Sequence, residues 1–453
     1  MRVVIIGAGL GGLCLAHGLH GAGFEVAVYE RDTRAGAAPA SYGIHLNADG
    51  LRALHACLPD RAWQHITARA IPARHVVNFH DPSNGLLATL DFRTPENATD
   101  PITSRRAVTR GDLRDALLLG TRDAAADGAT AQDLRGKLPI HWGKTFSSYS
   151  QDTDGRVVVA FADGTTTTCD LLVGADGSNS RVRGQRLPAL ARRDLGILNV
   201  AGRVPLTSEL QATLPPQLCD TSINNIVPAG QGWMFASTWA TGHAIAPLGA
   251  DGNRAAGRYL VWAWAARRDT YPSSGDDLTG EQLKKHVQQE IRDWASPFRD
   301  LVAATEPADI GPVPLRTMPP LEEWEPDNVT LLGDAIHNMT PMGGIGANTA
   351  LRDADTLRTL LLEHRGTLTR ASGDRRAQVT AAVGDYEKRM RPYANAALAL
   401  STKNAERATN PAPLPRSIFR TLLRAAARFP LLQRRIFHTP HLTVPAPRTR
   451  LGA

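Results

Sequence analysis

The residues Gly7-Ala8-Gly9-Leu10-Gly11-Gly12 have the spacing G-x-G-x-x-G, and they directly follow the apolar run from Val3 to Ile6. In a dinucleotide-binding loop, the glycine at the place of Gly7 permits a tight turn and the one at Gly9 lets the backbone approach a pyrophosphate. The third, Gly12, lets the helix and strand pack closely. The N-terminus of the following helix would present free N–H groups and a positive dipole end to the phosphates. We therefore expect a phosphate-binding loop at this position.

Glu30 closes the second expected strand, over residues 25–29. A carboxylate at this place can accept hydrogen bonds from the hydroxyls of an adenosine ribose, and it disfavours a 2′-phosphate. We expect the neighbouring Arg31 to contact the cofactor as well. These residues predict a bound dinucleotide, but they do not decide between FAD and NAD.

Two further motifs place an aspartate beside a glycine at the end of an apolar strand. Asp176-Gly177 follows the run 171–174, and Gly333-Asp334 follows the run 329–332. The second motif leads into Pro341-Met342-Gly343-Gly344 and then Gly346-Ala347-Asn348. With these three ordered motifs, the sequence resembles the class A flavoprotein monooxygenases, the para-hydroxybenzoate hydroxylase-like family, through about residue 362.

That resemblance implies FAD as the cofactor and NADPH or NADH as the reductant. It implies that Asp176 lies near both FAD and NAD(P)H, and that Asp334 binds the ribityl and pyrophosphate region of FAD. Arg110 matches the family arginine that reaches the flavin side of the cofactor. Gly43 matches a small residue beside the flavin ring.

The physical chemistry of the loop at 341–348 agrees with this resemblance. Reduced flavin carries negative charge near N1 and the C2 carbonyl, so a helix N-terminus aimed at that edge would stabilise it. The helix expected here begins with Gly346, Ala347 and Asn348. Pro341 and Gly344 belong to a strip of backbone with few side chains, which would leave room beside the ring for a flavin hydroperoxide.

The substrate side is less specific. Trp233, Phe235 and Trp239 alternate along one expected strand and would share one face of it, which suits a flat apolar or aromatic substrate. An aromatic core is the alternative interpretation. His45 could bind substrate or assist proton transfer, or it could be a hydrogen-bonded structural histidine. Arg203 is a comparable candidate on the substrate side, with a surface salt bridge as its alternative.

The elements needed to position these residues read as an α/β fold. A Rossmann-like three-layer FAD-binding domain would be assembled from separated segments, with an inserted β-sheet substrate domain and a helical C-terminus. The segments 195–317 contain short strand-like runs and one clear helix, from 281 to 294. The expected domain parts are FAD-binding residues 1–75, 105–190 and 321–365, substrate-domain residues 76–104 and 191–320, and a helical C-terminal region, 366–453.

Composition narrows the class of protein. The 453 residues carry a net charge of +7, nearly all of the positive charge being arginine, which does not by itself indicate a nucleic-acid partner. The four cysteines lie far apart without a metal-binding spacing, so we expect a reduced, cytoplasmic protein without a metal site. No apolar run is long enough to suggest an integral membrane segment.

The segment 417–429 reads as an amphipathic basic helix. Packing on its own protein is the default expectation for such a helix. Contact with a membrane surface or with an acidic carrier protein is the alternative.

The function predicted from these features is an FAD-dependent, NAD(P)H-consuming monooxygenase. It would insert one oxygen atom from molecular oxygen into an apolar or aromatic small molecule, by hydroxylation or epoxidation through a C4a-hydroperoxyflavin, in secondary metabolism or aromatic catabolism. The alternatives are a flavin reductase or dehydrogenase without oxygen insertion and, more remotely, a halogenase or a non-enzymatic binding protein. The pair Trp262 and Trp264 resembles a halogenase motif, but we expect it to be an ordinary strand.

Overall fold

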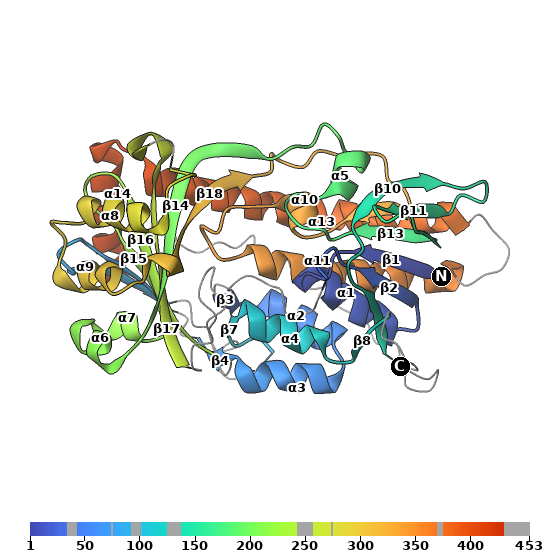
Figure 1. Cartoon of the computed structure of the whole chain (residues 1–453), viewed down its shortest axis with the longest axis horizontal. Helices are drawn as coiled ribbons and strands as arrows, with labels where there is room; N and C mark the ends of the chain where they lie inside the picture. The colour runs from blue at the N-terminus through green and yellow to red at the C-terminus, as the bar shows by residue number, and fades with distance from the viewer. Residues whose placement is uncertain are drawn as a thin grey trace.

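A computed structural model describes residues 1–33, 43–73, 76–91, 100, 102–124, 137–241, 257–272, 275–368 and 375–429. The molecule is elongated, with a six-stranded sheet toward one end and a seven-stranded sheet toward the other (Figure 1). Helix α13 (Arg375–Thr409) runs lengthwise from the first sheet toward the second and contacts β19 (Val329–Leu331) and β17 (Gly257–Arg267). The part of the expected helical C-terminal region beyond residue 429 lies outside the described residues.

The six-stranded sheet has the order β19-β13-β1-β2-β9-β8, and its neighbouring strands pair in parallel. Its central strands are short apolar runs because helices and a second sheet layer leave both faces buried. Its strands are β1 (Arg2–Ile6), β2 (Glu25–Tyr29), β8 (Thr121–Asp123), β9 (Leu138–His141), β13 (Leu171–Gly174) and β19 (Val329–Leu331).

The seven-stranded sheet has the order β18-β14-β17-β16-β15-β5-β6 and is antiparallel except for the β15–β5 pair. Its outer face carries the core that includes Trp262, Trp264 and the helices α8 and α9. Its strands are β5 (Val76–His80), β6 (Leu86–Asp91), β14 (Arg193–Pro205), β15 (Ile223–Ile226), β16 (Trp233–Thr241), β17 (Gly257–Arg267) and β18 (Ile310–Thr317).

Two three-stranded sheets complete the strand structure of the described residues. One contains β10 (Phe146–Gln151), β11 (Val157–Phe161) and β12 (Thr166–Cys169), and the other contains β3 (Gly43–Leu46), β7 (Arg106–Thr109) and β4 (Ile71–Pro72). The helices besides α13 are α1 (Leu10–Gly21), α2 (Ala48–Cys57), α3 (Asp60–Arg69), α4 (Arg110–Leu118), α5 (Arg181–Arg186), α6 (Ser208–Thr213), α7 (Pro216–Cys219), α8 (Gly280–Glu290), α9 (Ser296–Ala303), α10 (Asp334–His337), α11 (Gly346–Glu363), α12 (Arg365–Leu368) and α14 (Pro413–Arg428).

The α/β fold class predicted from the sequence is confirmed. The expected C-terminal end of the helix over 281–294 was wrong. Helix α8 already ends at Glu290, and a separate helix, α9, begins at Ser296. The expectation of one helix between 195 and 317 was also wrong. Threonine and proline start signals, such as Thr207 capping α6, produce short helices there whose few residues give no clear periodicity. The proposed domain boundaries stay a prediction.

No helix in the described ranges combines the length and apolar character needed to cross a bilayer.

Candidate active site

The glycine loop between β1 and α1 is tightly enclosed by backbone. Gly7 has φ +109° and its N–H donates to the Tyr29 carbonyl at 2.8 Å. A β-carbon at Gly7 would collide with the carbonyl of Ala175, and one at Gly12 would collide with the carbonyl of Gly7. Both positions therefore require glycine, Gly7 for its backbone angle as well as for space. The loop leaves Gly9 at the N-cap of α1 without a side-chain cap, so the first N–H groups of α1 are available to a phosphate.

Glu30 lies beside this loop. One carboxylate oxygen accepts from the Ala8 N–H at 2.7 Å and the other accepts from the Asp32 N–H at 3.0 Å. These two bonds fix the carboxylate at the carboxyl ends of β1 and β2, where a ribose would lie. The Arg31 side chain is 76% exposed and pairs with Asp32 at 3.8 Å, and its contact with a cofactor stays a prediction.

The carboxylate of Asp176 is engaged within its own turn. It accepts from the Ser180 hydroxyl at 2.5 Å and from the backbone N–H groups of Arg181 at 2.8 Å and Val182 at 3.3 Å. The backbone of Ala175 and Asp176 lies directly against Gly7. Asp176 thus lies next to the glycine loop, while its carboxylate accepts from backbone N–H groups at the start of α5.

The Gly333-Asp334 turn rests on a buried network. The Gly333 N–H donates to Asp353 at 2.7 Å, and the same carboxylate is 2.6 Å from the Nε2 of His337 and accepts from the Tyr393 hydroxyl at 2.7 Å. Burial alone would lower the pKa of His337, but the charge and hydrogen bond of Asp353 outweigh it and raise the pKa. Asp334 itself is exposed, so its carboxylate can meet a ligand.

The loop leading into α11 is held by Asn348. Its side-chain nitrogen donates to the carbonyls of His45 at 2.9 Å and Gly344 at 3.4 Å, and its oxygen accepts from the Asn47 N–H at 2.9 Å. Asn348 therefore ties the loop to strand β3, and only its backbone N–H is left for a cofactor. Gly346, at the start of α11, follows an N-cap residue without a side-chain cap.

Two features of this loop concern Pro341 and Gly344. The carbonyl of Pro341 accepts from the N–H groups of Gly343 at 2.8 Å and Gly344 at 3.0 Å. Gly344 has φ +64°, and a β-carbon there would meet no atom of the described residues within 4 Å. The space beside Gly344 is therefore open among the described residues, and its use by a flavin hydroperoxide stays a prediction.

Strand β3 contacts both this loop and strand β16 of the seven-stranded sheet. A β-carbon at Gly43 would collide with the indole of Trp239, and the rings of His45 and Trp239 have centroids 5.3 Å apart. Burial lowers the pKa of His45 to about 3, with a smaller contribution from the charge of Arg105. His45 is thus a neutral imidazole at physiological pH.

A row of buried polar atoms without hydrogen-bond partners lies here in the described structure. It consists of the Nε2 of His45, the Nε1 of Trp239 and the hydroxyl of Tyr259. Trp239 stacks on Tyr259 with centroids 6.3 Å apart, because the two residues pair directly across β16 and β17. Unsatisfied buried polar groups cost about 1–3 kcal/mol each, so such a row indicates a place for a ligand. The sequence alone did not single out Tyr259, because its place opposite Trp239 depends on how β16 and β17 pair.

The two predicted arginines have different surroundings. Arg110 begins α4 and is exposed, and it follows Thr109, the β7 residue that pairs with Gly43. Arg203 forms a buried ion pair with Asp309 at 3.1 Å. The alternative of a surface salt bridge for Arg203 was therefore wrong. Since its guanidinium is engaged by Asp309, Arg203 is better placed to hold the sheet than to act on a substrate.

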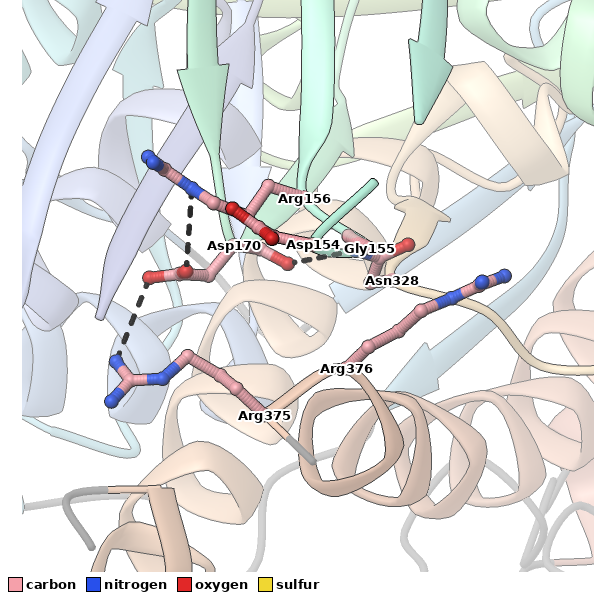
Figure 2. A pocket seen from close by; sticks show the side chains of 7 residues that line it. All are labelled: Asp154, Gly155, Arg156, Asp170, Asn328, Arg375 and Arg376. Atoms are coloured by element: carbon pink, nitrogen blue, oxygen red, sulfur yellow. Dashed lines mark hydrogen bonds and ion pairs between the residues drawn. The ribbon is translucent and has the colours of Figure 1, made fainter. Parts of the chain in front are cut away.

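Two cavities lie away from these loops. One, of about 310 Å³, is lined by Arg156, Asp170, Arg375 and neighbouring residues (Figure 2). Asp170 pairs there with Arg156 at 4.0 Å and with Arg375 at 3.9 Å, so the charge of Asp170 is already paired within the protein. This cavity lies at the amino ends of the parallel strands, opposite to the glycine loop. The other, of about 270 Å³, lies beside α14.

The residues present fit FAD. The glycine cradle at Gly7 and Gly12, the oriented Glu30 and the exposed Asp334 are arranged at the carboxyl edge of the parallel sheet, where a dinucleotide is bound in this topology. Among the residues that the structure describes, no group of three or more His, Cys, Asp or Glu side chains could hold a metal ion.

Comparison with known proteins gives consistent matches. Residues 1–383 match the family model described as an FAD binding domain. A dual O-methyltransferase/FAD-dependent monooxygenase of Cercospora beticola is 29% identical over 383 residues, which are 80% of this chain and 42% of that protein. The chain thus spans less than half the length of that relative.

Two solved structures are also similar. A protein of Photorhabdus luminescens subsp. laumondii TTO1, assigned as an FAD-containing monooxygenase, is 36% identical, with a TM-score of 0.77 over 90% of this chain and 98% of that one. The structure of Klebsiella pneumoniae HpxO complexed with FAD and uric acid has a TM-score of 0.70 at 21% identity, over 95% of both chains. The second similarity concerns the fold alone.

Proposed function

The chain belongs to the class A FAD-dependent monooxygenase family, and from that premise we propose that it inserts one atom of molecular oxygen into an apolar or aromatic small molecule. NADPH or NADH is the proposed reductant, and the cytoplasm the proposed location. FAD, when bound and reduced, supplies the activation of oxygen. The protein supplies binding, orientation and an environment from which water is excluded.

The proposed cofactor contacts follow from the positions described above. The N-terminus of α1 holds the pyrophosphate, Glu30 accepts from the ribose hydroxyls, and Asp334 accepts from hydroxyls of the ribityl or phosphate side. The N-terminus of α11 stabilises negative charge on the reduced ring. Arg110 lies near the flavin side of the cofactor, next to the strand that carries Gly43.

One observation carries the substrate proposal: His45, Trp239 and Tyr259 present buried polar atoms without partners within the described structure. The row is connected to the loop at Gly344 through Asn348, which bonds to both His45 and Gly344. Because an indole N–H can only donate, the substrate should present an acceptor oxygen. A planar compound with a hydroxyl or carbonyl group fits both these atoms and the aromatic surface.

Neutral His45 is proposed to bind this substrate group by a hydrogen bond. Because its pKa is about 3, the imidazole does not store a proton near neutral pH. The aromatic residues Phe235 and Trp239 lie on the same side of β16 and provide the apolar contact, with ring centroids 6.3 Å apart.

The test is the substitution Tyr259→Phe in the FAD-loaded protein. Loss of one hydrogen bond should raise the KM for a hydroxyl- or carbonyl-bearing substrate roughly fivefold to tenfold, from about 1–1.5 kcal/mol. FAD content should stay unchanged. An unchanged KM would remove Tyr259 from the substrate site.

Product analysis separates the first alternative. A flavin reductase or dehydrogenase would consume NAD(P)H without transferring oxygen to the substrate.

The halogenase alternative is weakened by the positions of Trp262 and Trp264, which are buried in the outer core of the seven-stranded sheet. The Trp262 indole donates to Thr305 at 2.8 Å, an internal structural bond.

A further inference from the structure

Exposed apolar side chains gather on one helix. Of the residues that the structure describes, the large apolar side chains between 39% and 70% exposed are Leu86, Leu414, Ile418, Leu422 and Phe429. Three of them belong to α14, Phe429 follows directly at its C-terminal end, and Leu86 lies on β6, the strand that α14 packs against. This clustering is unusual, because single exposed apolar residues are normally scattered over a protein surface.

The spacing of these residues defines an open face of α14. Leu414, Ile418 and Leu422 follow one another at intervals of four, so they lie on one side of the helix. The opposite side is already used, since Leu423 belongs to a buried cluster with Phe79 and the partly buried Phe419 packs against that cluster. Helix α14 therefore carries two apolar faces, one packed on the seven-stranded sheet and one facing outward.

The charged side chains of α14 itself are all positive. No aspartate or glutamate occurs between residues 413 and 429, and Arg424 and Arg428 are exposed. Two other arginines of α14 are used internally: Arg416 donates to backbone carbonyls, and Arg420 pairs with Asp81 at 3.8 Å. An apolar stripe flanked by exposed arginines complements the acyl chains and anionic headgroups of a lipid surface.

We propose that α14 docks this protein on the surface of an anionic lipid bilayer. Leu414, Ile418 and Leu422 enter the boundary between headgroups and acyl chains, and Arg424 and Arg428 contact lipid phosphates. The helix lies in the plane of the surface and does not cross the bilayer.

This docking would place the substrate sheet next to the apolar phase. Phe419 of α14 contacts Trp233 with ring centroids 6.0 Å apart, and Trp233 alternates with Phe235 along the strand that also carries Trp239. Figure 1 shows α14 at the end of the molecule occupied by the seven-stranded sheet. The docking proposal rests on the surface of α14 and holds whatever reaction the enzyme catalyses.

The test is flotation of the full-length, flavin-loaded protein with two kinds of vesicle, one of phosphatidylcholine alone and one of equal parts phosphatidylcholine and phosphatidylglycerol. The protein should float with the anionic vesicles, and binding should fall as salt is raised. Ile418→Ser should lower the partition coefficient roughly tenfold or more, because one large apolar side chain no longer enters the lipid. Arg424→Gln should lower it roughly fivefold.

Ser417→Ala is the matched control, since Ser417 is an exposed neighbour on the same helix but off the apolar stripe. It should bind as the wild type does. Flavin content and thermal midpoint establish that each variant is folded, which exposed positions should permit.

Three results would overturn the proposal: no binding of wild-type protein to anionic vesicles, equal binding by Ile418→Ser, or a lipid-free dimer that Ile418→Ser dissociates. The last result would assign the stripe to a second copy of this chain.

Discussion

Asp353 is the residue through which the account of the cofactor site can be tested most sharply by substitution. Its fully buried carboxylate receives three bonds, from the Gly333 N–H, from His337 and from the Tyr393 hydroxyl. Gly333 immediately precedes Asp334, the proposed FAD-binding carboxylate. Asp353 thus acts on the cofactor indirectly, as a positioning residue for the Gly333-Asp334 turn.

The magnitude follows from the bonds that Asp353→Asn removes. An amide has nearly the same shape but no charge, so the bonds from Gly333 and His337 lose their charged acceptor. A hydrogen bond to a charged group contributes about 1.5–3 kcal/mol. In Asp353→Asn, FAD binding must order the loosened turn, and this cost lowers FAD affinity. The lost free energy corresponds to a roughly tenfold to hundredfold weaker FAD affinity.

The assay is FAD titration of apoprotein by fluorescence quenching, together with thermal unfolding of the holoprotein. Tyr393→Phe removes one neutral donor and leaves the charge, so it should have a smaller effect, about 1 kcal/mol. Asp355→Asn is the matched control on the same helix, where the carboxylate pairs with Arg358 at 3.2 Å. It should leave FAD affinity within about twofold, as expected of a partly exposed pair. Wild-type FAD affinity in folded Asp353→Asn would refute the reasoning.

Three further results are expected. Glu30→Gln should weaken FAD binding, measured by flavin release on dilution, because a neutral amide accepts less strongly from ribose hydroxyls; a selective loss of nicotinamide affinity instead would assign this loop to the other cofactor. Gly344→Val should lower the ratio of product to NAD(P)H consumed and raise peroxide, since φ +64° disfavours a β-branched residue and its side chain would enter the open space; an unchanged ratio would move the oxygen chemistry elsewhere. Burial raises the pKa of Glu387 from 4.5 to about 7, so the folded state should become less stable as pH rises from 4.5 through 7, by up to about 3 kcal/mol. Urea unfolding at a series of pH values should show this slope for the wild type and not for Glu387→Gln.

Much of the fold could be predicted because its signals are local. The glycine spacing in residues 7–12 and the alternation along β16 are both short-range sequence patterns, and the structure has both.

The support of the site could not be predicted, because it depends on contacts between distant residues. Asp353 and Tyr393 are 40 positions apart, and Arg203 and Asp309 are 106 apart. Only the fold brings these pairs together. The same is true of Asn348, whose side chain joins α11 to strand β3 across 303 residues.

The central claim is oxygen insertion, and isotope labelling tests it most directly. The purified protein would be supplied with NADPH or NADH and a panel of planar hydroxyl- and carbonyl-bearing aromatic compounds under isotopically labelled oxygen, with products analysed by mass spectrometry and peroxide assayed in parallel. The account predicts that at least one compound gains a single labelled oxygen atom for each NAD(P)H consumed. Reduction of the flavin by NAD(P)H that yields only peroxide or unlabelled products across the panel would contradict it.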